Sequence, residues 1–200
     1  MKKKMPILLV DCDGVLTDQL CLFSALNKEL GKDKKFEDCF SYHLHEVWET
    51  KPEEIDEALN RIEKTFSYES VDPARDAIEA IGQLQKKFKV IILTARKPQH
   101  ESATKVWAKK YFKNLDIIFA RTDHNRHGNN SPETKLEVCK RLNAFALIED
   151  NPHELLDLAK QKISTQTICF NAPYNQDLDK NKKIFRGNWI EIRDHLLGQF

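Results

Sequence analysis

The chain has 200 residues, 40% of them hydrophobic, which is enough for one globular core and a modest insertion. Its 32 basic and 31 acidic side chains leave a formal net charge of +1, so no global field would gather nucleic acid or a membrane surface. No stretch approaches a membrane span, and Lys2-Lys3-Lys4 with the short apolar run after Met5-Pro6 is too short and too quickly acidic for a signal peptide. We therefore expect a cytoplasmic protein without a membrane partner.

The five cysteines favour neither a disulfide framework nor a zinc site, because their number is odd and no two form a Cys-x-x-Cys pair. We interpret them as reduced thiols, in agreement with a cytoplasmic location. They are Cys12, Cys21, Cys39, Cys139 and Cys169.

The most informative segment is a short apolar run, Ile7 to Val10, which ends in Asp11-Cys12-Asp13-Gly14. Branched apolar residues closed by a glycine turn predict a buried parallel strand, and ligand sites of open α/β sheets lie at the carboxyl ends of such strands. The turn at Gly14 lets the chain curl, so that both carboxylates can approach one ligand. The alternative is an ordinary solvated turn rich in aspartate.

The rest of the chain alternates between predicted helices and strands. Residues 19–70 are predicted to be helical and uneven, with aromatic and histidine residues gathered from Phe36 to Trp48. From Asp72-Pro73 onward we expect, in chain order, a helix to about Phe88, a strand at 90–93, a helix at about 99–112, a strand at 117–119, a helix opened by 131–134, a strand at 145–148, a helix from Pro152 and a strand at 167–170. This alternation predicts an α/β fold with a doubly wound, mostly parallel sheet. The stretches 122–130 and 174–183 are predicted surface loops.

Polar residues follow several of the predicted strands and would share one crevice if the strands run toward the same edge. They are Asp11 and Asp13, Thr94 and Arg96, Lys135 near a helix start, and Glu149 and Asp150. A carboxylate that attacks a phosphate ester meets a repulsion on the order of 4 kcal/mol, which a hard cation removes. Mg²⁺ prefers oxygen ligands, which Asp11, Asp150 and the backbone carbonyl of Asp13 could supply.

The remaining groups fit phosphoryl transfer. The Thr94 hydroxyl and the Lys135 ammonium could bind the phosphoryl oxygens as charge develops. Asp11 would form an aspartyl-phosphate, while Asp13 would protonate the leaving oxygen and later activate water. Simpler interpretations stay open for Thr94, which could be satisfied by backbone, and for Arg96, which could equally well pair with a structural carboxylate.

Other residues have a structural explanation that we favour. Two histidines, His43 and His45, lie two residues apart, and on a helix they would face different directions, which argues against a metal site. The aromatic side chains of the same segment are predicted to form its core, although one or two could line a substrate pocket. They are Phe36, Phe40, Tyr42 and Trp48.

The ordered set resembles the haloacid dehalogenase superfamily of phosphotransferases. The matching segments are Asp11 to Asp18, Leu93-Thr94-Ala95-Arg96, Lys135, and Ile148-Glu149-Asp150-Asn151-Pro152. Within the superfamily, the chain is similar to the small 5′-nucleotidases of the 5′(3′)-deoxyribonucleotidase type, also through Pro173-Tyr174-Asn175 and Asn188-Trp189. In place of the aromatic residue that these enzymes typically have after the first motif, the chain has Gln19-Leu20.

The resemblance implies a phosphomonoesterase that uses Mg²⁺ and acts on a nucleotide or a similarly small ester. Asp11 and Asp13 would be catalytic, and the phosphate would bind to Thr94, Ala95, Arg96 and Lys135. The metal would be held by Asp11, Asp13 and Asp150, with Glu149 acting through water. Residues 1–18 and 71–200 would form the catalytic core, and residues 19–70 a helical cap that closes over the substrate.

Two other functions are compatible with parts of the pattern. A polynucleotide 3′-phosphatase would share these motifs and use basic residues near Arg96, Arg121 and Arg126, although the near-zero net charge weighs against nucleic acid. A receiver-type phospho-switch also combines acids, a hydroxyl and a lysine, but its acceptor follows a later strand. The glycines form no dinucleotide-binding or P-loop motif. The oligomeric state is left open.

Overall fold

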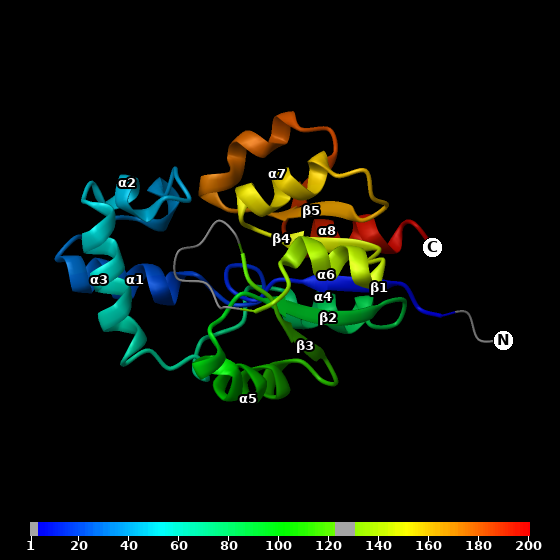
Figure 1. The fold of residues 1–200 in the computed structure, drawn as a ribbon, viewed down its shortest axis with the longest axis horizontal. Coiled ribbons are helices and arrows are strands. Elements are labelled where there is room, and N and C mark those ends of the chain that lie inside the picture. Colours follow the sequence, from blue (N-terminus) through cyan, green and yellow to red (C-terminus); the bar gives the residue numbers. More distant parts are fainter. Residues whose placement is uncertain (1–3, 123–130) are drawn as a thin grey trace.

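The computed structural model describes residues 4–122 and 131–200, and its centre is a parallel sheet. Within these ranges six strands pair in the order β3-β2-β1-β4-β5-β6, so the predicted doubly wound, mostly parallel α/β sheet is confirmed (Figure 1). The strands are β1 (Ile7–Val10), β2 (Lys89–Thr94), β3 (Asp116–Phe119), β4 (Ala146–Glu149), β5 (Gln166–Phe170) and β6 (Ile184–Gly187). This order puts β1 in the interior of the sheet, between β2 and β4.

Helices cover both faces of the sheet and, with it, make up what we call the sheet region. They are α4 (Ala77–Leu84), α5 (Glu101–Tyr111), α6 (Lys135–Leu142), α7 (Pro152–Lys160) and α8 (Trp189–Leu197). Successive strand residues point to opposite faces, so Leu8 packs with Trp107 and Trp189 on one side, while Leu9 packs with Val138 on the other. Because both faces are buried, the strands are almost continuously apolar.

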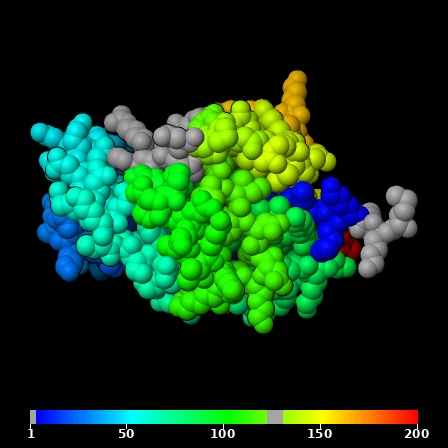
Figure 2. Space-filling view, turned by 60° about the horizontal axis from the view of Figure 1, so that its bottom comes forward, coloured from blue at the N-terminus to red at the C-terminus, as the bar shows by residue number. Residues whose placement is uncertain are grey.

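The segment between β1 and α4 contains α1 (Leu20–Leu30), α2 (Leu44–Trp48) and α3 (Pro52–Glu63), which we call the helical insertion. It forms one end of the molecule beside the sheet region (Figures 1 and 2). A hydrophobic cluster of its own includes Phe23, Ile55 and the fully buried Trp48. The Trp48 indole N–H donates to Asn27 Oδ1 at 3.0 Å, so this buried polar group has a partner. The separate cluster supports the proposal that residues 19–70 form a cap.

Two members of the predicted core of this segment, Phe40 and Tyr42, lie outside its cluster, and Tyr42 contacts His153 and Tyr174 instead. Phe40 is 67% exposed, whereas Trp48 is fully buried and Phe36 packs at the edge of the cluster. Aromatic composition alone could not distinguish them, because Phe40 follows the one-turn 3₁₀ helix at 36–38 and lies outside any helix with an apolar face.

One helix boundary and one predicted loop also differ from the prediction. The helix expected from Asp72 begins at Ala77, because Pro73 forms a β-bridge with Thr17 and the Asp72 carbonyl accepts the Asp18 N–H at 2.9 Å. The stretch predicted as a surface loop contains a 3₁₀ helix, Pro173–Lys180, with buried Asn175 and Leu178, and β6 follows it.

Part of the sequence analysis concerns residues outside the described ranges. The predicted loop 122–130 lies outside them except for Thr122, and Arg126 is among the residues left out. Across the described ranges, no helix combines the length and apolar character that crossing a membrane requires.

Candidate active site

The turn after β1 places Asp11 at the carboxyl edge of the sheet. The Asp11 N–H donates to the Ile148 carbonyl at 2.9 Å, which continues the pairing of β1 with β4. Gly14 then adopts φ +81°, and a Cβ there would collide with Gln19 and the Asp150 carboxylate. The turn therefore needs glycine for its conformation and for the close approach of the Asp150 and Gln19 side chains.

Lys135 reaches the same edge because α6 begins at this residue. Thr134 caps the helix: its Oγ1 accepts the Glu137 N–H at 3.1 Å, and the Glu137 carboxylate accepts the Thr134 N–H at 2.7 Å. The first helical side chain points to the sheet edge, where Lys135 Nζ donates to Asp11 Oδ1 at 2.7 Å and to Glu149 Oε2 at 2.6 Å. The sequence-predicted lysine thus joins the predicted acids directly.

Two carboxylates contact this lysine, a third, that of Asp150, lies beside them, and we call these four residues the inner cluster. Ligand oxygens of Asp11, Glu149 and Asp150 all lie within 4.8 Å of one another. All four side chains belong to buried residues, with exposures of 1–5%. One lysine against three buried acids leaves an excess of negative charge, so the arrangement is suited to a cation with hard oxygen ligands.

The burial of the inner cluster shifts its protonation equilibria. Burial and the neighbouring charge of Glu149 raise the pKa of Asp11 to about 8, although Lys135 opposes this shift. Burial, Glu149 and Asp11 also raise the pKa of Asp150 well above its ordinary value. Burial alone would lower the pKa of Lys135, but Asp11 and Glu149 outweigh it and raise that pKa. The lysine therefore stays charged, while Asp11 and Asp150 resist losing their protons.

Glu149 and Asp150 are held differently, although they are neighbours at the end of β4. Glu149 Oε1 accepts the backbone N–H groups of Asp150 and Asn151, both at 3.1 Å, so both of its oxygens have protein donors. Asn151 caps α7, since its Oδ1 accepts the His153 N–H at 3.0 Å. Asp150 is instead held by side chains from other segments.

Sequence reasoning missed the groups that hold Asp150 as parts of the site. Asp150 Oδ2 accepts from Gln19 Nε2 at 2.8 Å and from the Tyr174 hydroxyl. The buried Asn175 amide donates to the Asp150 carbonyl at 3.0 Å. Tyr174 and Asn175 belong to Pro173-Tyr174-Asn175, one of the segments through which the chain resembles the small 5′-nucleotidases. Gln19 stands where those enzymes typically have an aromatic residue. The resemblance was therefore the sequence signal that pointed to these three residues.

The second acid of the first motif lies apart from the inner cluster. Asp13 pairs with Arg96: Nε donates to Oδ2 at 2.9 Å and Nη2 to Oδ1 at 2.6 Å. We call these two residues the outer pair. The Arg96 side chain is 2% exposed and that of Asp13 is 53% exposed. Arg96 thus pairs with a predicted catalytic acid, and its binding to the substrate phosphate stays a prediction.

Two further predicted phosphate-binding residues, Thr94 and Ala95, lie at the carboxyl end of β2 next to Arg96. Thr94, fully buried at the end of β2, accepts the Arg96 N–H on its hydroxyl at 3.2 Å, and Ala95 is half-buried beside it. Arg121, named for the polynucleotide alternative, donates to the carbonyls of Ser131 and Pro132 at 3.1 and 2.5 Å.

The histidine pair is close to the sheet region. The rings of His43 and His45 lie 5.9 Å apart, and the His43 ring lies 5.3 Å from that of His153. Tyr42 contacts His153 and Tyr174, with ring centres 5.9 and 5.6 Å apart. Tyr42 therefore belongs to the contact between the helical insertion and the site.

Comparison with known proteins relates this geometry to a family. A model of the family "5' nucleotidase, deoxy (Pyrimidine), cytosolic type C protein" matches residues 5–198. A protein of Halalkalibacterium halodurans named "Putative nucleotidase BH1399" is 21% identical over 187 residues, which cover 92% of this chain and 89% of the relative.

Solved structures show the same fold. The haloacid dehalogenase-like hydrolase SP0104 of Streptococcus pneumoniae has a TM-score of 0.64 at 16% identity, over 96% of this chain and 98% of the other. A HAD family hydrolase of Deinococcus radiodurans, solved with phosphate and sodium, has a TM-score of 0.60 at 14% identity, over 97% and 96%. With the match to nearly its whole length, the chain belongs to the cytosolic type C 5′-nucleotidase family, which makes it a phosphate-monoester hydrolase of the haloacid dehalogenase type.

Proposed function

We propose that the protein is a Mg²⁺-dependent phosphomonoesterase that hydrolyses a nucleotide, or a similarly small phosphate ester, through an aspartyl-phosphate. The observation that carries this proposal is the inner cluster, three buried carboxylates and one lysine at the edge of the sheet. The family match supports the substrate class, and the name of the relative from Halalkalibacterium halodurans supports a nucleotide.

The residues present fit a magnesium ion. Three buried acids against one lysine need a further positive charge, and carboxylates are the ligands that Mg²⁺ prefers. Asp11, Asp150 and the backbone carbonyl of Asp13 would hold the ion, with Glu149 acting through water. The bound ion would reduce the repulsion between the Asp11 carboxylate and the phosphate ester.

Different residues of the chain would carry out the separate steps of the reaction. A carboxylate oxygen of Asp11 forms a bond to phosphorus while the ester P–O bond breaks, and Asp13 donates a proton to the leaving oxygen. Asp13 next takes a proton from water, which attacks the aspartyl-phosphate, releases inorganic phosphate and restores Asp11. Thr94, the Ala95 N–H and Lys135 would bind the phosphoryl oxygens. A phosphate contact by Arg96 would require its guanidinium to exchange Asp13 for the substrate.

The helical insertion would act as the cap in this scheme. Its Tyr42 contacts Tyr174, whose hydroxyl donates to Asp150, so the segment is linked to the inner cluster through Tyr174. A cap in this place could exclude water from the phosphoryl group and select the leaving group. We also propose a cytoplasmic location, in line with the description of the family.

A panel of phosphate esters tests the proposal. The purified protein would be assayed for phosphate release from 5′- and 3′-nucleotides, sugar phosphates and 3′-phosphorylated oligonucleotides, with Mg²⁺ or with excess chelator. Hydrolysis of a nucleotide that disappears with chelator and returns with Mg²⁺ is expected. Full activity in excess chelator would contradict the metal-assisted mechanism, and a preference for oligonucleotide ends would favour the polynucleotide 3′-phosphatase instead.

A further inference from the structure

The guanidinium of Arg96 is fixed by contacts around its plane. Its edge makes the two-point pair with Asp13, and Nη1 donates to Thr104 Oγ1 at 3.1 Å. Its central carbon lies 4.6 Å from the centre of the Tyr68 ring and 5.8 Å from that of Trp107. An arginine that is 2% exposed and held in this way has little rotational freedom.

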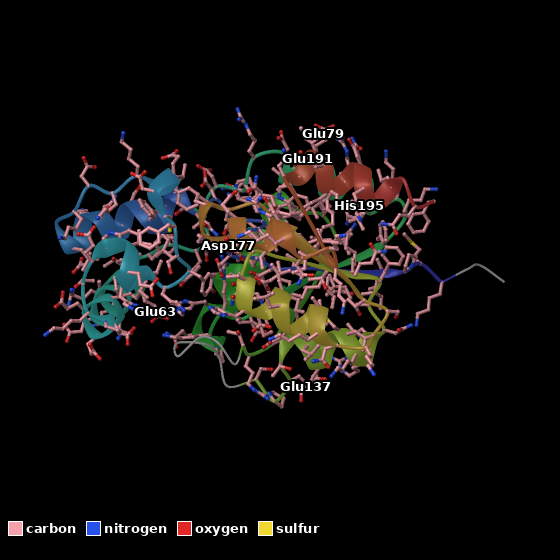
Figure 3. The ribbon with its side chains drawn as sticks, turned by 90° about the horizontal axis from the view of Figure 1, so that it is seen from above. Glu63, Glu79, Glu137, Asp177, Glu191 and His195 are labelled. Atoms are coloured by element: carbon pink, nitrogen blue, oxygen red, sulfur yellow. The ribbon has the colours of Figure 1, made fainter. Side chains whose placement is uncertain are left out.

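Two of the surrounding residues connect Arg96 to the helical insertion. Tyr68 lies in the segment that leads from α3 back to the sheet region, and its ring centre is 4.3 Å from that of His100. Glu63, the last residue of α3, accepts from Lys97 Nζ at 2.7 Å and contacts His100 Nε2 at 2.6 Å. Figure 3 labels Glu63 on the side of the helical insertion nearer the sheet region. The turn that carries Arg96 is therefore tied to the end of α3.

The partner of Arg96 is the more exposed group of the pair. A carboxylate with a half-exposed side chain would rotate between several conformers, but a two-point pair with a fixed guanidinium selects one of them. Proton transfer needs the acid within hydrogen-bond reach of the leaving oxygen, and small misplacements cost large factors in rate. An ammonium group could supply the charge but not the planar two-point contact.

We propose that Arg96 is a positioning residue that orients Asp13 for proton transfer, and that Tyr68 holds Arg96 in place from the helical insertion's return segment. This inference rests on the proposed function, in which Asp13 is the general acid and base. It differs from the expectation that Arg96 binds the substrate phosphate, since it assigns the guanidinium to the enzyme's own carboxylate.

The two roles predict different responses to the leaving group. The first-turnover rate would be measured by rapid quench with phenyl phosphate, whose leaving group needs a proton, and with a dinitrophenyl phosphate, whose leaving group does not. We expect Arg96→Lys and Tyr68→Leu to slow phenol release about tenfold or more, a part of the roughly 10²–10⁴ that general acid catalysis supplies. Release from the activated ester should stay within about twofold, with unchanged half-saturating substrate concentrations, because activated leaving groups need no positioned acid.

Parallel losses for both esters, together with weaker inhibition by inorganic phosphate, would overturn the proposal and make Arg96 a phosphate ligand. The proposal would also be overturned if the ratio of the phenyl phosphate rate to the dinitrophenyl phosphate rate were unchanged in both Arg96→Lys and Tyr68→Leu. Tyr68→Phe keeps the ring over the guanidinium and should restore the wild-type ratio. Tyr111→Leu is the matched control, because Tyr111 packs against Trp107 at 5.7 Å on the same helix but is not among the groups around Arg96.

The wild-type protein and Asp11→Asn separate this inference from the proposed function. If the wild type hydrolyses neither ester, or if Asp11→Asn hydrolyses both, the proposed function fails. If the wild type is active and Asp11→Asn is not, the ratio in the Arg96 and Tyr68 variants decides the inference alone. Urea denaturation of each variant confirms that the compared proteins are folded, and Arg96→Gln provides a second removal of the two-point pair if Arg96→Lys is unstable.

Discussion

The carboxylates of Asp11 and Asp13 come from one short motif but lie in different surroundings. Asp11, in the inner cluster, is buried, pairs with Lys135 and has a pKa raised to about 8. Asp13, in the outer pair, is half-exposed and is held by a buried arginine. The two positions differ because Asp11 continues the pairing of β1, whereas Asp13 lies beyond it in the turn. A sheet edge can thus give the same residue type two different tasks.

The largest effect should come from the inner cluster. Asp11→Asn removes the nucleophile, so we expect no measurable turnover and no phospho-enzyme, because an amide cannot form the aspartyl-phosphate. Phosphate release and the intact mass of acid-quenched protein would be measured. A phospho-enzyme of unchanged abundance in this variant would show that another residue is the nucleophile.

Substitution of Asp13 in the outer pair should reduce activity less than substitution of Asp11 and should leave Mg²⁺ affinity unchanged. Asp13→Asn should lower kcat by roughly 10²–10⁴, the contribution of general acid–base catalysis, while it keeps the backbone carbonyl proposed to bind the metal. Calorimetric titration with Mg²⁺ should therefore give an affinity close to that of the wild type. An equal loss of metal affinity in Asp11→Asn and Asp13→Asn would remove the distinction between the two acids.

The lysine of the inner cluster can be tested through stability. Lys135→Met leaves buried carboxylates without their partner, and breaking a buried ion pair typically costs about 3–5 kcal/mol. Urea unfolding in chelator should show this loss, and Mg²⁺ should reduce it by supplying the missing positive charge. Lys105→Met, on the exposed face of α5, is the control. Equal losses with and without Mg²⁺ would argue against a metal at this place.

The pH dependence of the metal-free protein should sharpen the contrast further. Because the pKa of Asp11 rises from 3.8 to about 8 on folding, the folded chain keeps a proton that the unfolded chain has released between about pH 4 and 8. Stability in chelator should therefore fall as the pH rises through this range, by an amount on the order of a few kcal/mol. Urea unfolding from pH 5 to 8 measures this slope, which Asp11→Asn should reduce; the raised pKa of Asp150 contributes to the slope that remains. A slope that Asp11→Asn leaves unchanged would assign it to other groups.

The smallest effects are expected in the helical insertion. Tyr42→Ala should lower kcat/KM for a nucleotide more than for a small aryl phosphate, since Tyr42 lies beside Tyr174 while the phosphate-binding residues belong to the sheet region. Phe40→Ala, at an exposed position, should change the free energy of unfolding by no more than about 0.5 kcal/mol. Specificity constants for both esters would be compared in folded variants. Parallel losses for the two esters would make Tyr42 a structural residue only.

Local sequence patterns predicted much of the sheet and of the inner cluster. Residues close together in the sequence are enough to identify three features: the apolar run before Asp11, the alternation of later strands and helices, and the helix start at Lys135. They place acids, a hydroxyl and a lysine at strand ends and helix starts. Parallel strands end at one edge, so these residues had to meet once the sheet formed.

Other features depend on contacts between segments far apart in the chain. Asp13 meets Arg96 across 83 positions, and Gln19 meets Asp150 across 131. Hydrophobic periodicity shows which face of its own element a residue occupies, but it carries no information on which polar partner another element brings there. For that reason, the sequence by itself determined which acids lie at the sheet edge, whereas only the tertiary structure decided that Lys135 pairs with one of them and Arg96 with the other.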